Sequence, residues 1–207
     1  MRERPIIFNA DMVRAVLDGR KTQTRRIMRE QPEVIPKEDE FGKAGFWIPF
    51  NAGKTMVRNE DMYIACPFGL KGDRLWVRET FRVHSRATDV ATLVYKASEQ
   101  QSWTQQTHRV PIEKCNKPAV VDKWTPSIHM PRWASRITLE ITGIRVERLH
   151  TITLGDICKE IGCDLYDFRP VTYGFQVWEK LWQSIYGADS WQANPWVWVI
   201  EFKRVNV

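Results

Sequence analysis

The stretch Gly19-Arg20-Lys21-Thr22-Gln23-Thr24-Arg25-Arg26 places four cationic and two hydroxyl side chains within eight residues. Gly19 ends an apolar helical pattern that begins after Asn9, since glycine is common just beyond the last turn of a helix. The threonines and the alternation in the second half of the stretch predict a strand. Hydroxyl, guanidinium and ammonium groups all bind phosphate or carbonyl oxygens, so the stretch predicts a ligand site. A solvated basic strand is the alternative interpretation.

Positive charge is concentrated at the start of the chain. The 207 residues carry a net charge of +6, and residues 1–30 hold eight Lys or Arg against four Asp or Glu. The first seventh of the chain therefore contributes +4 of the +6. Such a cluster favours an anionic partner, so we expect RNA or DNA to bind there. A nucleoside, which is uncharged, is the alternative partner.

Composition and length indicate one globular domain spanning 1–207. Hydrophobic residues make up 43% and charged residues 27%, so the chain can bury a core without a disulfide or a metal. The chain starts without the apolar core of a signal peptide, and no apolar run approaches the ~18 residues of a membrane span. The four cysteines form no C-x-x-C pair, and their spacing from the four histidines matches no zinc module. We therefore expect a cytoplasmic protein with free thiols, no membrane partner, no metal and no cofactor.

Hydrophobic patterns predict a β-rich chain with two or three helices. The strongest strand pattern changes phase at Gly143, where a β-bulge is expected. The last strand begins apolar on both faces, which favours a central position in a sheet. The predicted strands are Pro5–Phe8, Arg74–Arg82, Thr92–Lys96, Arg136–Val146 and Trp196–Arg204. The later helices are predicted at Leu154–Ile161, capped by Thr153, and at Phe175–Tyr186.

Two long segments, 29–68 and 97–132, are interrupted repeatedly by proline or by polar residues. They are predicted to be irregular insertions, the first with at most a short hairpin. The remaining strands and helices fit a small closed or half-closed β-barrel with peripheral helices.

The pattern Gly19-Arg20-Lys21-Thr22-x-Thr24-x-Arg26 resembles the signature of the ASCH family, whose fold resembles the PUA domain. Further matches follow in the expected order: Gly72-Asp73-x-Leu75-x-Val77, Ile137–Val146, Thr153–Gly162 and Trp196–Lys203. The resemblance implies a mixed α/β, β-rich, PUA-like barrel in which the two insertions are additions. The longer arrangement, with Cys66-Pro-Phe-Gly and Trp76-Val-Arg-Glu79, resembles ASCH-like proteins of phages and prophages.

Family members that hydrolyse N4-acetylcytidine use a Lys, a Thr and a Glu, which the resemblance places on Lys21, Thr24 and Glu160. The implied activity is that of an amidohydrolase. Thr24 would attack an amide carbonyl, Lys21 would accept its proton, and a carboxylic acid would protonate the leaving amine. Residues three apart in a regular strand point to opposite faces, so a shared site requires an irregular chain at Lys21.

Two alternatives stay open for this function. The chain could be a non-catalytic module that binds RNA or DNA, as PUA-like domains often do, and a morphogenetic or regulatory phage role is a third interpretation. Glu79 competes with Glu160 for the acid role, because it shares the apolar face of Leu75 and Val77. A structural ion pair of Glu79 with Arg25 or Arg26 is the favoured interpretation.

Further binding candidates lie in the basic stretch and in a Pro-rich loop. Most of the ten tryptophans fit core positions, whereas Trp124 and Trp133 flank the loop and are candidates to line a substrate. The binding candidates are Arg20, Thr22, Arg25, Arg26, Arg78, Trp124, His129, Arg132 and Trp133.

Overall fold

A computed structural model describes residues 1–31, 33–35, 45–50, 55–57, 64 and 66–205. The chain is a mixed α/β, sheet-rich protein. Its strands are β1 (Glu3–Ile7), β2 (Gln23–Ile27), β3 (Glu33–Ile35), β4 (Gly45–Phe50), β5 (Thr55–Val57), β6 (Arg74–Arg78), β7 (Phe81–Arg86), β8 (Val90–Tyr95), β9 (Thr107–Pro111), β10 (Thr138–Arg148) and β11 (Trp196–Val205). Its α-helices are α1 (Ala10–Leu17), α2 (Trp103–Gln106), α3 (Leu154–Ile161), α4 (Val171–Tyr186) and α5 (Ala188–Gln192).

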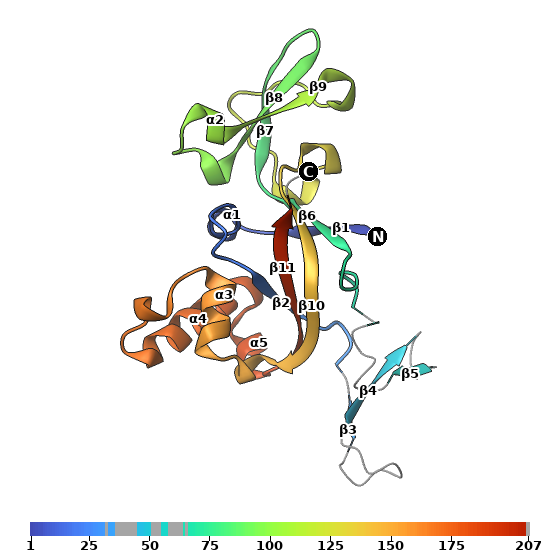
Figure 1. The fold of residues 1–207 in the computed structure, drawn as a ribbon, viewed down its shortest axis with the longest axis vertical. Helices are drawn as coiled ribbons and strands as arrows, with labels where there is room; N and C mark the ends of the chain where they lie inside the picture. Colours follow the sequence, from blue (N-terminus) through green and yellow to red (C-terminus); the bar gives the residue numbers. More distant parts are fainter. Residues whose placement is uncertain (32, 36–44, 51–54, 58–63, 65, 206–207) are drawn as a thin grey trace.

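The central sheet has the strand order β1-β6-β10-β11-β2. β1 and β6 run parallel, and the other neighbours are antiparallel. β10 and β11 form the long central pair, with α3, α4 and α5 beside one half of it and the β7-β8-β9 sheet beyond the other end (Figure 1). Within the described residues β1 and β2 are edges of this sheet, so closure into a barrel stays a prediction.

β11 is buried on both faces, as its sequence predicted. Trp198, Ile200 and Phe202 pack with α1, β1 and β6 in one hydrophobic cluster. Val197 and Val199 face the other way and pack with α3 and α4 in a second cluster. β11 therefore contacts the sheet core with one face and the helices with the other. β2 is its neighbour in the sheet.

Several local predictions are confirmed. Asn9 accepts a hydrogen bond from the Met12 amide at 2.9 Å and caps α1. Thr153 caps α3 in the same way, and α3 has the predicted bounds. The register of β10 against β11 shifts between Ile141 and Gly143, where the bulge was expected.

Other local predictions are wrong for reasons of tertiary structure. The single strand expected over Arg74–Arg82 is two strands, because β6 and β7 belong to different sheets. Segment 97–132 is not wholly irregular, since it contains α2 and β9. β9 is an edge strand that ends at Pro111, and an edge tolerates the proline and polar residues that obscured the pattern.

Segment 29–68 lies largely outside the described residues. Its described parts contain three strands in the order β3-β4-β5, which is more than the single hairpin expected. None of the described helices is long and apolar enough to cross a membrane.

Gly162 lets the end of α3 approach α1 closely. Its φ is +82°, and a Cβ there would lie 2.7 Å from the Cβ of Ala15 and 3.3 Å from the amide nitrogen of Lys21. Gly19 is a closer control, because it also lies just beyond a helix, its φ is +75° and a Cβ would meet nothing within 4 Å.

We predict that Gly19→Ala lowers the free energy of unfolding by about 1 kcal/mol through backbone strain. Gly162→Ala should lower it by about 3 kcal/mol, because overpacking adds to the same strain. Urea unfolding of both variants measures the difference, and equal losses would show that α3 and α1 are not in close contact.

Candidate active site

The predicted ligand segment begins in an irregular turn. The backbone amides of Arg20 and Lys21 both donate to the carbonyl oxygen of Ala15, at 2.9 and 3.0 Å, and β2 begins only at Gln23. Lys21 therefore precedes the strand and escapes the alternation that would point it away from Thr24. The irregular chain that a shared site requires is present.

The Lys21 side chain is wholly buried against α3. Its Nζ donates to the carbonyl oxygens of Gln23, at 2.7 Å, and of Glu160, and it lies 3.9 Å from Oε2 of Glu160. Nζ also lies 5.5 Å from the centroid of the Phe8 ring. Burial lowers the pKa of Lys21 from 10.5 to about 8; Glu160 opposes this shift, while Arg26 and Arg25 add to it.

Glu160 occupies the last turn of α3 and is 2% exposed. Its Oε1 accepts a hydrogen bond from the Arg25 amide at 2.7 Å, so the carboxylate joins α3 to β2. Its Oε2 makes no hydrogen bond within the described residues. A carboxylate at a helix C-terminus faces the negative end of the helix dipole, and the Lys21 ammonium offsets that repulsion.

Thr24 and Glu160 line one small cavity. Arg26 and the α4 side chains Trp178 and Trp182 line it too. Its volume is about 10 Å³, roughly the space of one water molecule. The structure thus places Thr24 and Glu160 on one cavity beneath α4, in a space too small for a nucleobase. Lys21 pairs with Glu160 but does not line this cavity.

The two arginines of β2 are engaged within the protein. The buried Arg25 guanidinium lies 3.0 Å from Glu147 and 3.6 Å from Asp156. Arg26 donates to the carbonyl oxygen of Ile7 at 2.7 Å, and its guanidinium lies 5.7 Å from the centroid of the Phe8 ring.

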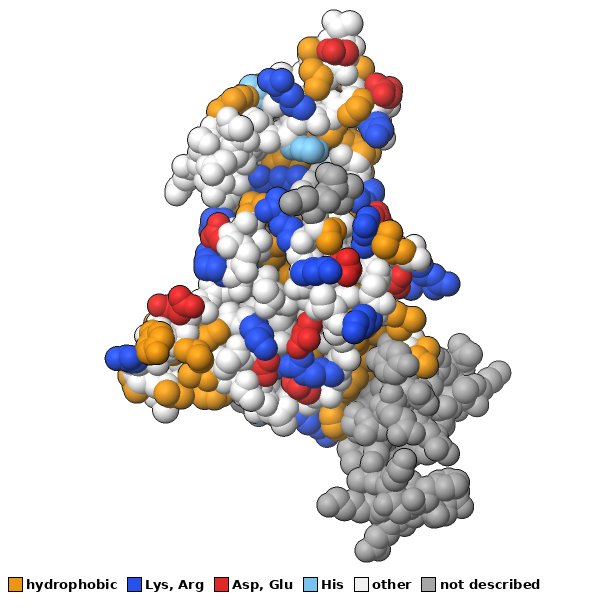
Figure 2. All heavy atoms as spheres, in the orientation of Figure 1, with side chains coloured by type: hydrophobic (Ala, Val, Ile, Leu, Met, Phe, Trp, Pro, Cys, Tyr) orange, Lys and Arg blue, Asp and Glu red, His pale blue; other side chains and the backbone are white. Residues whose placement is uncertain are grey.

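Arg25 belongs to an ionic network that sequence reasoning missed. Arg145 contacts Glu147, Asp156 and Glu201, and basic and acidic side chains interleave on this face of β10 and β11 (Figure 2). Burial opposes ionisation of Asp156, but the Thr153 hydroxyl and the two guanidinium groups together hold its pKa below the usual value. The sequence signal for this network was the spacing of Arg145 and Glu147, which are two residues apart and so share one face of a strand.

Glu79 forms a structural ion pair, but with a partner other than those predicted. The Arg136 guanidinium donates two hydrogen bonds to it, at 2.9 and 3.0 Å, and a third to the Ser98 hydroxyl. Burial raises the pKa of Glu79, and Arg136 opposes that rise. Arg136 also stacks 4.0 Å from the Tyr95 ring centroid, so this pair belongs to the β7-β8-β9 lobe.

The other residues of the basic segment, and Arg78, lie outside the cavity. Arg20 donates to the carbonyl oxygen of Gly162 and pairs with Asp18 at 2.8 Å. Thr22 is exposed, and its amide donates to the Lys159 carbonyl at 3.1 Å. The Arg78 guanidinium donates to the Ile128 carbonyl.

The Pro-rich loop does not border the cavity beside Thr24, so the predicted loop residues form no single pocket with it. Trp124 and His129 line a separate hollow of about 470 Å³. Arg132 and Trp133 line another of about 740 Å³, and Arg132 pairs with Glu3 at 2.9 Å.

Among the residues that the structure describes, no group of three His, Cys, Asp or Glu could hold a metal ion. Comparison of the chain with models of known protein families, with curated proteins and with solved structures finds no match.

The buried ammonium makes stability depend on pH. Unfolded Lys21 has a pKa of 10.5 and folded Lys21 about 8, so the unfolded chain binds more protons between these values. We predict that the free energy of unfolding of the wild type rises relative to that of Lys21→Met across this window, by about 3 kcal/mol.

Urea titrations from about pH 7 to pH 10 measure this difference, since all other groups titrate alike in both proteins. Lys180→Met, at an exposed lysine of α4, should run parallel to the wild type. Parallel curves for Lys21→Met as well would contradict the burial of a charged Lys21.

Proposed function

We propose that this chain is an ASCH-type, PUA-like protein and an amidohydrolase acting on an N4-acetylcytidine-like base. The observation that carries the proposal is that Glu160 lies beside Lys21 in an ion pair and beside Thr24 in one cavity, at the junction of β2 and α3. Lys21 and Glu160 are 139 residues apart in sequence, yet their charged groups lie 3.9 Å apart. The resemblance named these three residues without reference to their positions in space.

The environment of the three residues suits amide hydrolysis. With a pKa of about 8, on the order of a tenth of Lys21 is neutral at pH 7 and able to accept the Thr24 hydroxyl proton. The Thr24 oxygen then bonds to the acyl carbon and the C–N bond breaks, and the proton that Lys21 took from Thr24 passes through the Glu160 carboxylate to the leaving amine. Water cleaves the resulting Thr24 ester and releases the carboxylic acid.

Turnover by this route requires the site to open. The cavity beside Thr24 is closed by Trp178, Trp182 and Tyr186 of α4, and its volume of about 10 Å³ admits no base. The hydrolase proposal therefore includes a displacement of α4 when the substrate binds.

A second candidate is a non-catalytic module that binds RNA or DNA in the cytoplasm of a phage host. The closed cavity favours it, because the contacts of Lys21 and Glu160 join β2 to α3 without any substrate. Under this candidate the same residues are structural, and nucleic acid binds to basic residues elsewhere.

We predict that the purified protein releases acetate from N4-acetylcytidine and that Thr24→Val abolishes the release. Valine keeps the shape of threonine without the nucleophile, and loss of a nucleophile costs orders of magnitude in rate. Thr24→Ser should keep part of the activity, and Thr22→Val, at an exposed neighbour, should keep all of it. A fully active Thr24→Val enzyme would place the chemistry elsewhere.

If the wild type is inert, the binding module becomes the better account. That candidate predicts an affinity for single-stranded RNA or DNA that falls at least tenfold between about 50 and 200 mM salt, because bound cations displace counterions. Fluorescence anisotropy with a labelled oligonucleotide measures it. An affinity that does not change with salt would exclude a polyanion as the ligand.

A further inference from the structure

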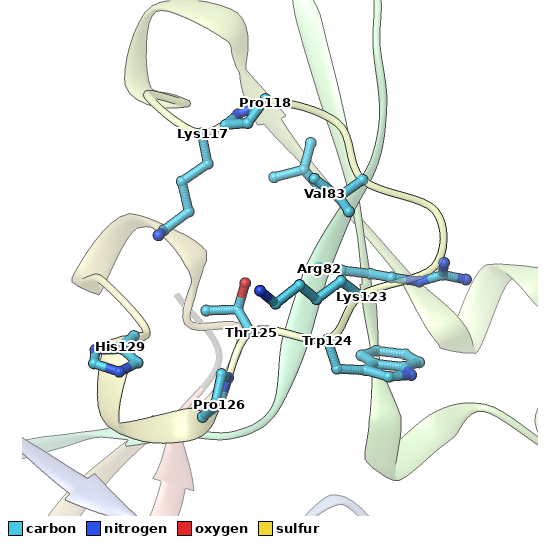
Figure 3. Close-up of a pocket in the computed structure, with 10 residues that line it drawn as sticks. Arg82, Val83, Lys117, Pro118, Lys123, Trp124, Thr125, Pro126 and His129 are labelled. Carbon is cyan, nitrogen blue, oxygen red and sulfur yellow. The ribbon is translucent and has the colours of Figure 1, made fainter.

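The 470 Å³ hollow lies between the free edge of β7 and the loop of residues 116–126 (Figure 3). Two anchors hold the loop on the strand. The Val120 amide donates to the Val83 carbonyl at 2.9 Å, and Thr125 exchanges two backbone hydrogen bonds with Phe81, at 2.8 and 3.2 Å. Between the anchors residues 121–124 oppose the single strand residue Arg82, so the loop bows outward.

Two lysines that pair with no Asp or Glu of the described residues point into this hollow. Lys117 and Lys123 come from opposite ends of the loop, and both ammonium groups reach toward the same space beside the Thr125 hydroxyl (Figure 3). No Asp or Glu lines the hollow. Lys96 nearby is different, since it pairs with Glu99 at 2.6 Å. The hollow therefore has two cations free to bind an anion.

The other charged wall residue is already in use. The Arg82 guanidinium lies 4.9 Å from the Trp124 ring centroid, and the Lys96 ammonium lies 5.3 Å from it. These stacked cations fix the bowed part of the loop against the sheet. Trp124 thus holds the wall of the hollow in place, and Lys117 and Lys123 remain available to a ligand.

Apart from the His129 imidazole, the rest of the lining is apolar and includes Val83, Pro118, Val120 and Pro126. A volume of about 470 Å³ lies within the ~300–1,000 Å³ typical of small-molecule sites and exceeds the needs of a bare phosphate ion. Apolar walls beside two ammonium groups fit a ligand with a flat, weakly polar body and one phosphate.

We propose that this hollow is a second binding site, which takes a nucleotide, either free or as one unit of a single strand. The phosphate lies between Lys117 and Lys123 within reach of the Thr125 hydroxyl, and the base rests on the prolines and valines. The site uses neither Lys21 nor any residue of the cavity beside Thr24, so it stands whether or not the chain is a hydrolase.

The test compares the full chain with a Lys117→Gln/Lys123→Gln variant by isothermal titration calorimetry. The probes are cytidine 5′-monophosphate, cytidine and a short single-stranded oligonucleotide. The double variant should bind the phosphate-bearing probe at least tenfold more weakly. Lys71→Gln/Lys180→Gln removes the same charge at two exposed lysines outside the hollow and should change the affinity less than twofold.

The probes separate the two sources of the phosphate. Mononucleotide binding that is lost in the double variant assigns the site to a free nucleotide. Oligonucleotide binding alone, lost in the same variant, assigns it to a strand, with a salt dependence reduced by about two ions. Three outcomes would overturn the proposal. Cytidine and its monophosphate could bind equally well, or neither phosphate probe could bind. The double variant, with an unchanged melting temperature, could also bind the phosphate probe as tightly as the wild type does.

Thr24→Val keeps this test separate from the hydrolase proposal. It should bind the phosphate probe as the wild type does, because Thr24 lines the other cavity. A loss of binding in Thr24→Val would place the nucleotide at β2 and overturn the second site.

Discussion

The burial of the Lys21 ammonium beside Glu160 is the constraint on which the candidate site depends. Removing an ammonium and a carboxylate from water costs several kcal/mol per ion, and only close partners offset that cost. Here two backbone carbonyls, the carboxylate and the Arg25 amide supply them. The same contacts fix the end of α3 on the start of β2, so Thr24 is positioned by the pair whether or not it reacts.

The basic character of the first 30 residues has a different meaning in the structure than in the sequence. Arg20, Lys21, Arg25 and Arg26 all make contacts within the protein. The lysines that point into an open hollow, and that have no ionic partner in the described part of the chain, come from segment 97–132, which the resemblance left aside as an insertion. The cluster of positive charge in the sequence thus belongs to side chains that hold the fold together. The lysines available to a ligand lie instead in a loop that is held on β7.

A structural feature could be predicted from the sequence where its cause lies in neighbouring residues of the chain. The caps at Asn9 and Thr153, the bulge near Gly143 and the double burial of β11 follow from neighbours along the chain, and all were predictable. The convergence of Lys21, Thr24 and Glu160 came from the resemblance alone. The partner of Glu79, the edge strand β9 and the cover of α4 over Thr24 depend on which elements meet in space, and no local pattern encodes that.

The protonation of Lys21 tests the central claim most directly, because burial beside Glu160 both positions the site and makes this lysine a usable base. Nuclear magnetic resonance of the side-chain nitrogen, assigned by comparison with Lys21→Met, would follow its titration in the folded protein. The structure predicts a midpoint near pH 8. A midpoint at the ordinary value of 10.5 would mean that the protein stabilises the Lys21 ammonium as well as water does, and it would contradict the proposed role of Lys21 as a base near neutral pH.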